Sequence, residues 1–321
     1  MLIGVDIGGT NTVIGLVDRS GRSVLDRMSV ATASLGSGDA LPAGLARMIE
    51  GFAAKNGLSP AAIDAIGIGT PGVVDPERGI SVNAVNLGYL DYPMAERVAE
   101  KTGRPVYLDN DVRMYGLGEA LHGAGRGHRH VLCLTVGTGL AAAIVTDGRL
   151  HYGGSYAAGE IGHMPVPGIE RDCVCGAYGC AEIYASATGM VRQANEAIAS
   201  GRASSLAAIA SAGGLSAAAI SDAYDQGDGL AAEIFERTAV WIADSLVAAV
   251  HLLDPDVIVI GGGVAKSGDR LLAPLRKSLS SRVHPIYRER LVIVAATCGD
   301  DAGLLGSAWN AKTRAGMASP E

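Results

Sequence analysis

Apolar residues along the chain form short β-branched runs that alternate with longer segments of helical periodicity. Residues 2–6 and 12–17 are joined by Ile7-Gly8-Gly9-Thr10-Asn11, which predicts a hairpin with a glycine-rich turn. In residues 39–55 apolar side chains recur every three or four positions, which predicts a helix. The same criteria predict further strands at 23–31, 65–69, 106–108, 131–136, 140–146, 149–152, 257–260 and 291–296. They predict further helices at 93–102, 112–121, 182–200, 204–212, 216–226, 229–253, 268–281 and about 301–314. Residues 315–321 are predicted to form a frayed tail.

The order strand, glycine turn, strand occurs twice, at the start of the chain and again from Val131. Each copy is followed by a mixture of helices and strands. This duplication predicts an α/β fold with two similar lobes and a cleft between them. We place the smaller N-terminal lobe at 1–111 plus about 303–321, and the larger C-terminal lobe at 112–302.

Composition and charge exclude several classes of partner. Of the 321 residues, 48% are hydrophobic and 18% charged, which is typical of a globular protein. The net charge of −7 gives no basic footprint for nucleic acid or an anionic membrane. The N-terminus has no basic region before an apolar one, and the apolar stretches are too short for a membrane span. We therefore expect a cytoplasmic protein.

Three of the five cysteines, Cys173, Cys175 and Cys180, fall within eight residues, and His163 precedes them by ten positions. Three thiolates and one imidazole form a complete tetrahedral zinc set, so the ion would be structural. The alternatives are buried free thiols, with His163 as an ordinary core histidine, or a disulfide. The disulfide is disfavoured because the cysteine number is odd and the N-terminus shows no secretory signal. Glu160 and Glu182 bracket the cluster, which indicates a polar ligand beside the metal.

Four glycine loops follow strands, at 8–10, 69–72, 137–139 and 261–263. Backbone N–H groups in such loops can approach an anion closely, although each loop alone is also an ordinary turn. The phosphate loop Gly-x4-Gly-Lys-Ser/Thr is absent. The segment 67–72 matches G-x-G-x-x-G, but the residues after it cannot begin a helix, which excludes a dinucleotide-binding oxidoreductase.

Acidic and amide side chains follow two of the predicted strands. Asp6 lies beside Gly8 and Gly9, where a carboxylate could hold Mg²⁺ near phosphates. Asp109-Asn110-Asp111 follows the strand at 106–108 and is too polar for packed core. One of the three could cap the next helix, but capping does not need three. We therefore take Asp111 as a candidate general base.

Six motifs occur in an order that resembles the ROK proteins (repressors, open reading frames, sugar kinases), and the resemblance covers nearly the whole chain. They are Asp6-Ile7-Gly8-Gly9-Thr10, Asn110-Asp111, Gly137-Thr138-Gly139, Glu160-Ile161-Gly162-His163, the run Cys-x-Cys-Gly-x-x-Gly-Cys-x-Glu, and Gly261-Gly262-Gly263. The resemblance implies the two-lobed actin-like ATPase (ribonuclease H-like) fold. It also implies ATP-dependent phosphorylation of a hexose at its 6-hydroxyl, and glucose is the first candidate for the substrate.

The resemblance assigns roles to individual residues. Asp111 takes the proton from the attacking hydroxyl, and Asp6 helps to position Mg²⁺. The ATP phosphates are held by Gly8, Gly9, Thr10, Asn11, Thr12, Gly137, Thr138 and Gly139, with Gly261, Gly262 and Gly263 near the nucleotide. The sugar side consists of Gly72, Asn86, Asn110, Asp111, Glu160, His163 and Glu182. His163, Cys173, Cys175 and Cys180 hold the structural zinc, and the histidine turns its other ring nitrogen towards the sugar.

The chain departs from the family pattern at Leu140–Ala143, at Tyr89 and at Val112–Tyr115, which leaves the identity of the sugar open. Alternatives are N-acetylglucosamine, N-acetylmannosamine, fructose or allose, and the donor could be polyphosphate. A non-catalytic sugar sensor is the alternative of another class. We expect no DNA-binding domain ahead of the first strand. By resemblance we expect a homodimer or homotetramer.

Overall fold

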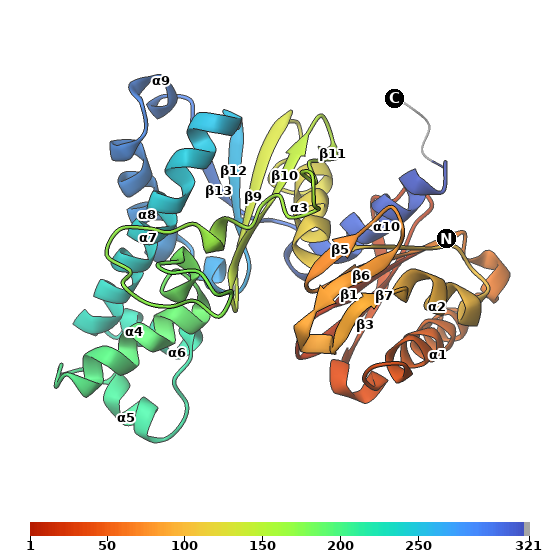
Figure 1. Ribbon diagram of the computed structural model, residues 1–321, viewed down its shortest axis with the longest axis horizontal. Helices are drawn as coiled ribbons and strands as arrows, with labels where there is room; N and C mark the ends of the chain where they lie inside the picture. The colour runs from red at the N-terminus through yellow and green to blue at the C-terminus, as the bar shows by residue number, and fades with distance from the viewer. Residues whose placement is uncertain (318–321) are drawn as a thin grey trace. The chain divides into compact units, whose positions relative to one another are not determined.

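The computed structural model describes residues 1–317, and their contacts divide the chain into two compact units (Figure 1). The first unit contains Met1–Gly127, Ala143–Ala158 and the chain from Thr297 onward. The second contains His128–Ala142 and Gly159–Ala296. The part of the predicted tail at 318–321 lies outside the described residues. Met317, by contrast, packs against the cluster that contains Leu305 and Ala308, so the chain is not frayed there.

These units are not the predicted lobes of 1–111 plus about 303–321 and 112–302. Helix α3 (Asp111–His122), which we assigned to the C-terminal lobe, packs against α10 (Ala302–Arg314). Glycines bring the two helices close together. A Cβ atom at Gly118 would lie 2.0 Å from the carbonyl oxygen of Ala302, and one at Gly306 would lie 1.8 Å from that of Met114. By its contacts α3 therefore belongs to the first unit.

The first unit is built on a five-stranded sheet of order β3-β2-β1-β4-β8. Strands β1 (Leu2–Ile7), β2 (Asn11–Val17) and β3 (Val24–Ala31) run antiparallel, which confirms the predicted hairpin. Strands β4 (Ala65–Thr70) and β8 (Val106–Asn110) lie parallel to β1. The carboxyl ends of β1, β4 and β8 therefore meet at one edge of the sheet, where Asp6, Thr70 and Asn110 lie.

The two faces of β1 carry different residues because side chains alternate along a strand. Ile3, Val5 and Ile7 join the core formed with α1 (Ala40–Lys55) and α2 (Met94–Thr102). Leu2 joins the opposite cluster, formed with α10. Figure 1 shows α1 and α2 on one side of this sheet and α10 on the other. Asp6 is in phase with Leu2, so its side chain lies on the α10 face.

Three strands were missed by the sequence analysis. Strands β5 (Val73–Asp75), β6 (Ile80–Ala84) and β7 (Tyr89–Tyr92) form a small antiparallel sheet. Each has five residues or fewer, and Pro76, Gly79 and Gly88 interrupt the pattern between them, so no run was long enough to indicate a strand. The strand at 73–75 agrees with the exclusion of a helix after Gly72.

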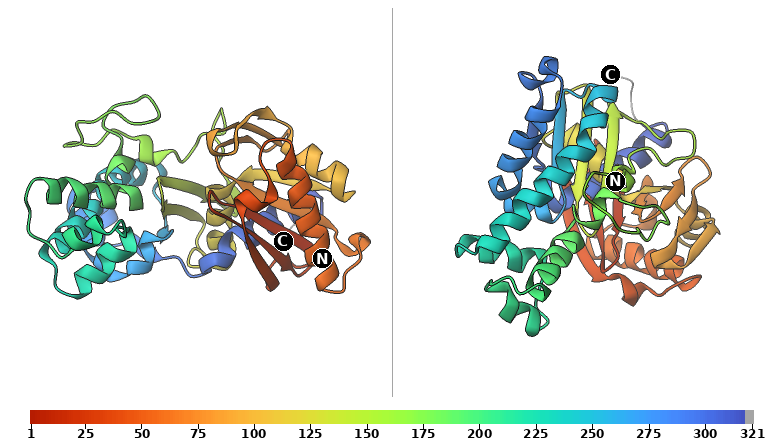
Figure 2. Two further views of the ribbon diagram at one scale, coloured as in Figure 1. Left: turned by 90° about the horizontal axis from the view of Figure 1, so that it is seen from below. Right: turned by 60° about the vertical axis from the view of Figure 1, so that its left-hand side comes forward.

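The second unit contains the parallel strands β9 (His130–Val136), β12 (Val257–Gly261) and β13 (Val292–Ala295). These strands belong to a sheet of order β11-β10-β9-β12-β13, in which β11 (Arg149–Leu150) and the end of β10 (Leu140–Thr146) are grouped by their contacts with the first unit. Its helices are α4 (Ala187–Ala199), α5 (Leu206–Ser211), α6 (Ala217–Asp225), α7 (Gly229–Leu253), α8 (Asp269–Arg282) and α9 (Pro285–Arg288), seen from two further sides in Figure 2. The predicted helix at 182–200 begins five residues late, since 181–183 is a 3-10 turn. None of the helices in residues 1–317 is long and apolar enough to cross a bilayer.

The buried carboxylate of Glu119 holds the chain near Ala124, before it leaves the first unit, and at Thr297, where it returns to this unit for the last time. Glu119 is fully buried near the end of α3, and three backbone N–H groups donate to its oxygens. Those of Ala124 and Thr297 lie 3.0 and 3.1 Å from Oε2, and that of Cys298 lies 2.7 Å from Oε1. The side chain therefore joins the end of α3 to the segment just before α10.

We predict that Glu119→Ala lowers the free energy of unfolding by about 3 kcal/mol, because it leaves buried N–H groups without acceptors. Urea unfolding measures the change, and Glu119→Gln should lose less because its amide keeps one oxygen. The matched control is Glu236→Ala, at an exposed position of α7. Equal stability of the two alanine variants would contradict this role.

Candidate active site

Two carboxylates lie at the strand ends of the first unit, and their charges influence each other. Asp6 lies at the end of β1 on the α10 face, and Asp111 is the first residue of α3, directly after β8. Burial, and then the negative charge of Asp111, raise the pKa of Asp6 from 3.8 to about 7. The structure therefore brings together the two acids that the sequence indicated as metal site and base.

Asn110 orients this site. It is the N-cap of α3, and its Oδ1 accepts from the backbone N–H of Arg113 at 3.1 Å. Its Nδ2 donates to Oδ1 of Asp111 and to the carbonyl oxygen of Gly72, both at 3.0 Å. One amide thus begins the helix, holds the carboxylate of Asp111 and fixes the loop at Gly72. That loop requires glycine, because φ is +92° and a Cβ would lie 2.2 Å from the carbonyl oxygen of Asn83.

Asp109 corrects one sequence inference. We predicted that Asp109-Asn110-Asp111 was too polar for packed core, but Asp109 is fully buried. Its Oδ1 accepts from Nε of Arg113 at 2.6 Å, and its Oδ2 accepts from the Tyr152 hydroxyl at 2.9 Å. Arg113 also donates to the carbonyl oxygens of Tyr156 and Val74, at 2.7 and 3.2 Å. Burial is tolerated because the charges are paired and hydrogen-bonded. The Asp-x-x-x-Arg spacing at a helix start could have revealed the pair.

The glycine loop after β1 is fixed by Thr32. The hydroxyl of Thr32 donates to the carbonyl oxygen of Gly8 at 2.8 Å. The backbone N–H of Thr32 donates to the carbonyl oxygen of Thr10, also at 2.8 Å. Gly9, Thr10 and Asn11 are exposed and available to a ligand. Thr12 differs, since it is fully buried with its hydroxyl 3.0 Å from that of Thr32. Thr12 therefore supports the loop from inside.

A cavity of about 470 Å³ adjoins Asp6. Asn11, Arg27, Tyr115, Asp300 and Gly303 are among the residues that line it. A Cβ at Gly303 would lie 2.8 Å from Oδ2 of Asp6, so the glycine makes room for the carboxylate. The sequence analysis missed Arg27 and Asp300. Neither belongs to a recognisable motif, and only the fold brings them to Asp6.

In the second unit, His163 lies among the cysteines and the two glutamates. Its Nδ1 lies 3.8 Å from Sγ of Cys173 and 3.7 Å from Oε1 of Glu182. Its Nε2 lies 3.8 Å from Oε2 of Glu160. The two ring nitrogens therefore face different partners, Nδ1 towards the thiols and Nε2 towards Glu160. Glu160 is half exposed, with 51% of its side chain accessible, so this side of the ring is open to a ligand.

The donor atoms of His163, Cys173, Cys175 and Cys180 all lie within 4.8 Å of one another. Sγ of Cys175 and Sγ of Cys180 are 3.7 Å apart. A tetrahedral zinc with Zn–S bonds of about 2.3 Å separates its sulfur ligands by about 3.8 Å, so this spacing fits the ion. It is far too long for a disulfide bond, and all five cysteines are free. Burial and the neighbouring thiols raise the pKa of Cys180 to about 12, so a bound cation must displace its proton.

Two glycine loops meet beside this cluster. The carbonyl oxygen of Gly137 accepts from the backbone N–H of Ala187 at 2.8 Å, at the start of α4. A Cβ at Gly139 would lie 2.9 Å from Oε2 of Glu182, and one at Gly262 would lie 2.6 Å from the carbonyl oxygen of Val136. The loops 137–139 and 261–263 are therefore adjacent, and Glu182 lies against the first of them.

The segment 159–163 packs on the strand where the chain departs from the family pattern. A Cβ at Gly159 would lie 1.9 Å from the carbonyl oxygen of Ala142, and one at Gly162 would lie 2.0 Å from that of Leu140. Leu140, Ala142 and Ala143 are buried, so their bulk points into the interior. Glycine at 162 thus has a packing reason, since it lets His163 approach the cysteines.

The predicted site residues accordingly form two groups. The first unit carries Asp6, Gly8, Gly9, Thr10, Asn11, Gly72, Asn110 and Asp111, and the second carries Gly137, Thr138, Gly139, Glu160, His163, Glu182, the three cysteines and Gly261–Gly263. Asn86 is exposed in the 3-10 turn Val85–Leu87, just after the β6 residues that contact Gly72.

Comparison with known proteins gives these groups a context. The model of the ROK family matches residues 2–314. The chain belongs to the ROK family. It is 34% identical to the glucokinase of Halalkalibacterium halodurans, across 97% of this chain and 94% of that protein. The solved structure of a ROK family glucokinase from Streptomyces griseus, in complex with glucose and AMPPNP, superimposes with a TM-score of 0.82 at 34% identity, across 97% of this chain and 99% of that one. The predictions of the family and of an actin-like fold are confirmed.

The ROK family also contains regulators. The DNA-binding transcriptional repressor Mlc of Escherichia coli is 28% identical across 77% of this chain and 60% of that protein. This second similarity is weaker and shorter than the similarity to the glucokinase.

We predict that Asp6 makes the stability of this ROK protein depend on pH. The folded protein keeps the Asp6 proton up to about pH 7, while the unfolded carboxyl loses it near 3.8, so stability from this group falls as the pH rises between these values. Asp6→Asn should therefore unfold at a higher temperature than wild type at pH 8 in metal-free buffer. The difference should shrink towards zero at pH 4. Thermal unfolding across this range checks it, and a constant difference would contradict the raised pKa.

We predict that Cys175→Ser abolishes zinc retention, because one thiolate of the four-donor set is replaced by a weaker ligand. Metal content of the purified protein is the readout. Cys298→Ser, which changes a cysteine outside the cluster, is the control and should keep the metal. Sugar phosphorylation should fall together with the zinc, because His163 loses its anchor. Full activity in metal-free Cys175→Ser would refute the coupling.

Proposed function

We propose that this protein transfers the γ-phosphoryl group of ATP to the 6-hydroxyl of a hexose, with glucose as the preferred sugar. The observation that carries the proposal is the pair Asn110–Asp111. A carboxylate is held by a neighbouring amide at the start of α3, beside a second acid and a glycine loop. The similarity to glucokinases over nearly the whole chain supports this activity.

Phosphoryl transfer requires little covalent chemistry from the protein. Asp111 accepts the proton of the attacking hydroxyl, and the hydrogen bond from Asn110 keeps its carboxylate in place. The exposed loop at Gly9, Thr10 and Asn11 offers backbone N–H groups to the phosphates, as does the loop 137–139. Asp6 would hold Mg²⁺, directly or through water, and the ion would neutralise phosphate charge. Gly261–Gly263 would border the nucleotide, as the family resemblance implies.

We infer from the family resemblance that Asn110, Glu160, His163 and Glu182 bind the sugar hydroxyls, together with Gly72 and Asn86. The orientation of His163 supports this assignment, because Nδ1 faces the thiols and Nε2 faces Glu160. A structural zinc on His163, Cys173, Cys175 and Cys180 would fix the tautomer and the ring plane. Nε2–H would then remain a donor that a sugar oxygen could accept from.

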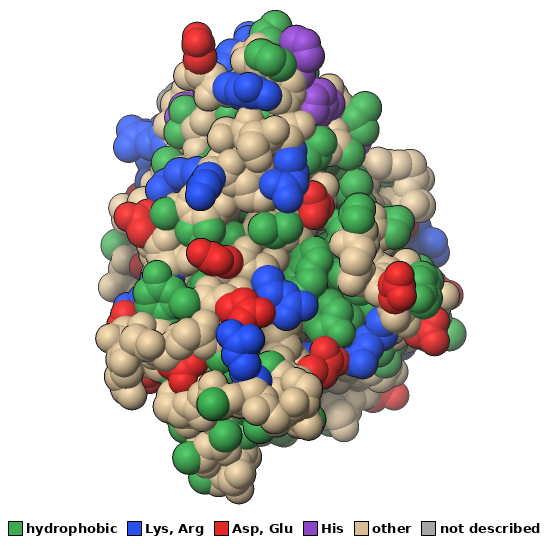
Figure 3. Space-filling model, turned by 90° about the vertical axis from the view of Figure 1, so that its left-hand side faces the viewer, with side chains coloured by type: hydrophobic (Ala, Val, Ile, Leu, Met, Phe, Trp, Pro, Cys, Tyr) green, Lys and Arg blue, Asp and Glu red, His purple; other side chains and the backbone are tan. Residues whose placement is uncertain are grey.

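The alternatives differ in substrate or in class. N-acetylglucosamine, N-acetylmannosamine, fructose and allose remain candidate sugars, because a few hydrogen bonds discriminate among them. A sugar-sensing regulator is the second class, favoured by the similarity to Mlc. The face of the molecule in Figure 3 intersperses Lys and Arg with Asp and Glu, which gives no continuous basic surface for nucleic acid on that face. Assembly as a homodimer and a cytoplasmic location also remain predictions.

The test is an ADP-coupled assay with Mg·ATP against hexoses and N-acetylhexosamines, with wild type and Asp111→Asn in parallel. We expect sugar-dependent ADP release with glucose as the best substrate. Asp111→Asn should lower kcat by about 10³-fold and leave KM for glucose within a few-fold, because it removes the base and keeps the shape. Glu236→Ala, on an exposed face, should match wild type.

One result would reject the kinase assignment, and another would reject the role of Asp111 as its base. One is sugar binding by zinc-loaded wild type with no ADP release for any sugar, which favours a sensor. The other is equal kcat in wild type and Asp111→Asn, which removes Asp111 from the chemistry.

A further inference from the structure

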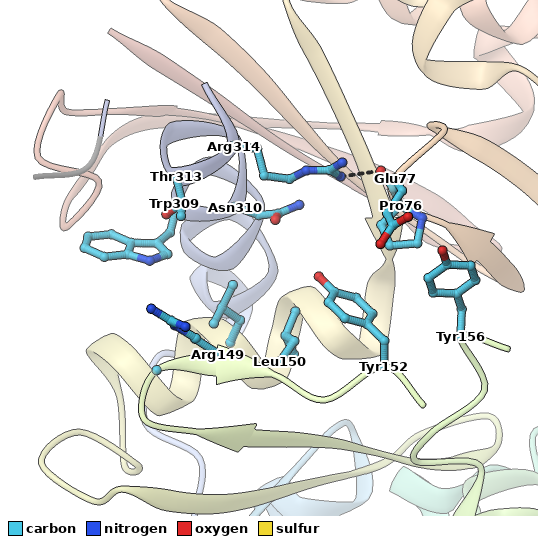
Figure 4. Close-up of a pocket in the computed structure, with 12 residues that line it drawn as sticks. Pro76, Glu77, Arg149, Leu150, Tyr152, Tyr156, Trp309, Asn310, Thr313 and Arg314 are labelled. Carbon is cyan, nitrogen blue, oxygen red and sulfur yellow. Dashed lines mark hydrogen bonds between the residues drawn. The ribbon is translucent and has the colours of Figure 1, made fainter. Parts of the chain in front are cut away.

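A second cavity, of about 360 Å³, lies in the first unit and shares no lining residue with the cavity beside Asp6. Its walls come from α10, from α3 and from the segment that follows β10 (Figure 4). They are formed by Trp309, Tyr152, Tyr156, Leu117, Leu150 and Asn310, with Arg149, Arg314 and Glu77 also lining it. The proposed kinase chemistry uses none of these residues.

A buried amide in this cavity lacks a partner. Asn310 is only 7% exposed, and among residues 1–317 its Nδ2 finds no hydrogen-bond acceptor. Figure 4 shows the Asn310 side chain between Trp309 and Tyr152, on the cavity wall. Buried amide donors are nearly always satisfied, because leaving one unpaired costs free energy. An occupant with an acceptor oxygen would satisfy this group.

The charged groups around the cavity favour an anion. The guanidinium of Arg149 forms no hydrogen bond or ion pair with any residue that the structure describes. Arg314 already donates to the carbonyl oxygen of Pro76 and lies over the ring of Tyr107. Glu77 is the single acid among the residues that line the cavity. The guanidinium of Arg149 and Nδ2 of Asn310 are therefore both donors that lack an acceptor among the described residues.

We propose that this cavity binds a small aromatic anion, namely a carboxylate on one or two fused rings. The rings lie between Tyr152 and Trp309, and the carboxylate accepts from Nδ2 of Asn310 and from Arg149. The volume is within the range of small-molecule pockets, and a few placed donors on aromatic walls are typical of them. Tyr152 also donates a hydrogen bond to Asp109, the neighbour of Asn110 at the end of β8. An occupant that contacts Tyr152 is therefore one hydrogen bond away from this strand end.

Calorimetric titration of the full-length protein, without sugar or nucleotide, tests the proposal with 2-naphthoate. Its uncharged control is 2-naphthamide, which has the same rings and nearly the same shape. We expect one molecule of 2-naphthoate per chain and at least tenfold weaker binding of the amide. The experiment does not depend on phosphorylation, so its failure is distinct from failure of the kinase assignment.

Substitutions locate the binding in this cavity. Arg149→Gln and Asn310→Asp should each weaken 2-naphthoate binding at least tenfold, the first by removing the cation and the second by placing a negative charge on the same shape. Arg97→Gln on α2, outside the cavity, should leave affinity unchanged. Because Arg149 is exposed, its variant keeps the test valid even if Asn310→Asp fails to fold. Absence of saturable heat at millimolar 2-naphthoate, or equal affinity in Arg149→Gln and wild type, would overturn the proposal.

Discussion

The close approach of helix α10 to its neighbours is the constraint on which the candidate site depends. The helix backbone lies on the sheet only because two strand positions are glycine: a Cβ at Gly4 would lie 2.2 Å from the carbonyl oxygen of Leu304, and one at Gly67 would lie 1.8 Å from that of Ser307. On its other side α10 holds α3, which begins with Asp111. Gly303, in the first turn of α10, borders the carboxylate of Asp6. One packed helix therefore sets the positions of both acids.

In the second unit a compact loop has the corresponding role. His163 ends the short 3-10 helix Ile161–His163 and the cysteines lie in a loop, and a cation is a natural cross-link between such segments. Glu182 connects this loop to the glycine loop 137–139, since its carboxylate lies against Gly139. We therefore expect that loss of a metal here would disturb the proposed phosphate loop as well as a proposed sugar ligand.

Much of this could be predicted from the sequence, for identifiable reasons. The long periodic segments, such as 229–253, and the β-branched runs beside glycine turns determine their own structure locally. The cysteine cluster was recognisable because its ligands are close in sequence. By contrast, β5, β6 and β7 are too short for a periodic signal. The burial of Asp109 depends on Arg113 and Tyr152, and Asp300 joins Asp6 only through the packing of α10, so these features needed the three-dimensional structure.

The central claim is that the fold holds the carboxylates of Asp6 and Asp111 near enough to influence each other. Carbon-13 NMR titration of the aspartate carboxyl groups, in wild type and in Asp111→Asn without Mg²⁺, measures this directly. The account predicts that Asp6 titrates near pH 7 in the wild type and at a lower pH once the charge at 111 is removed. An Asp6 that titrates near 4 in both proteins would contradict it.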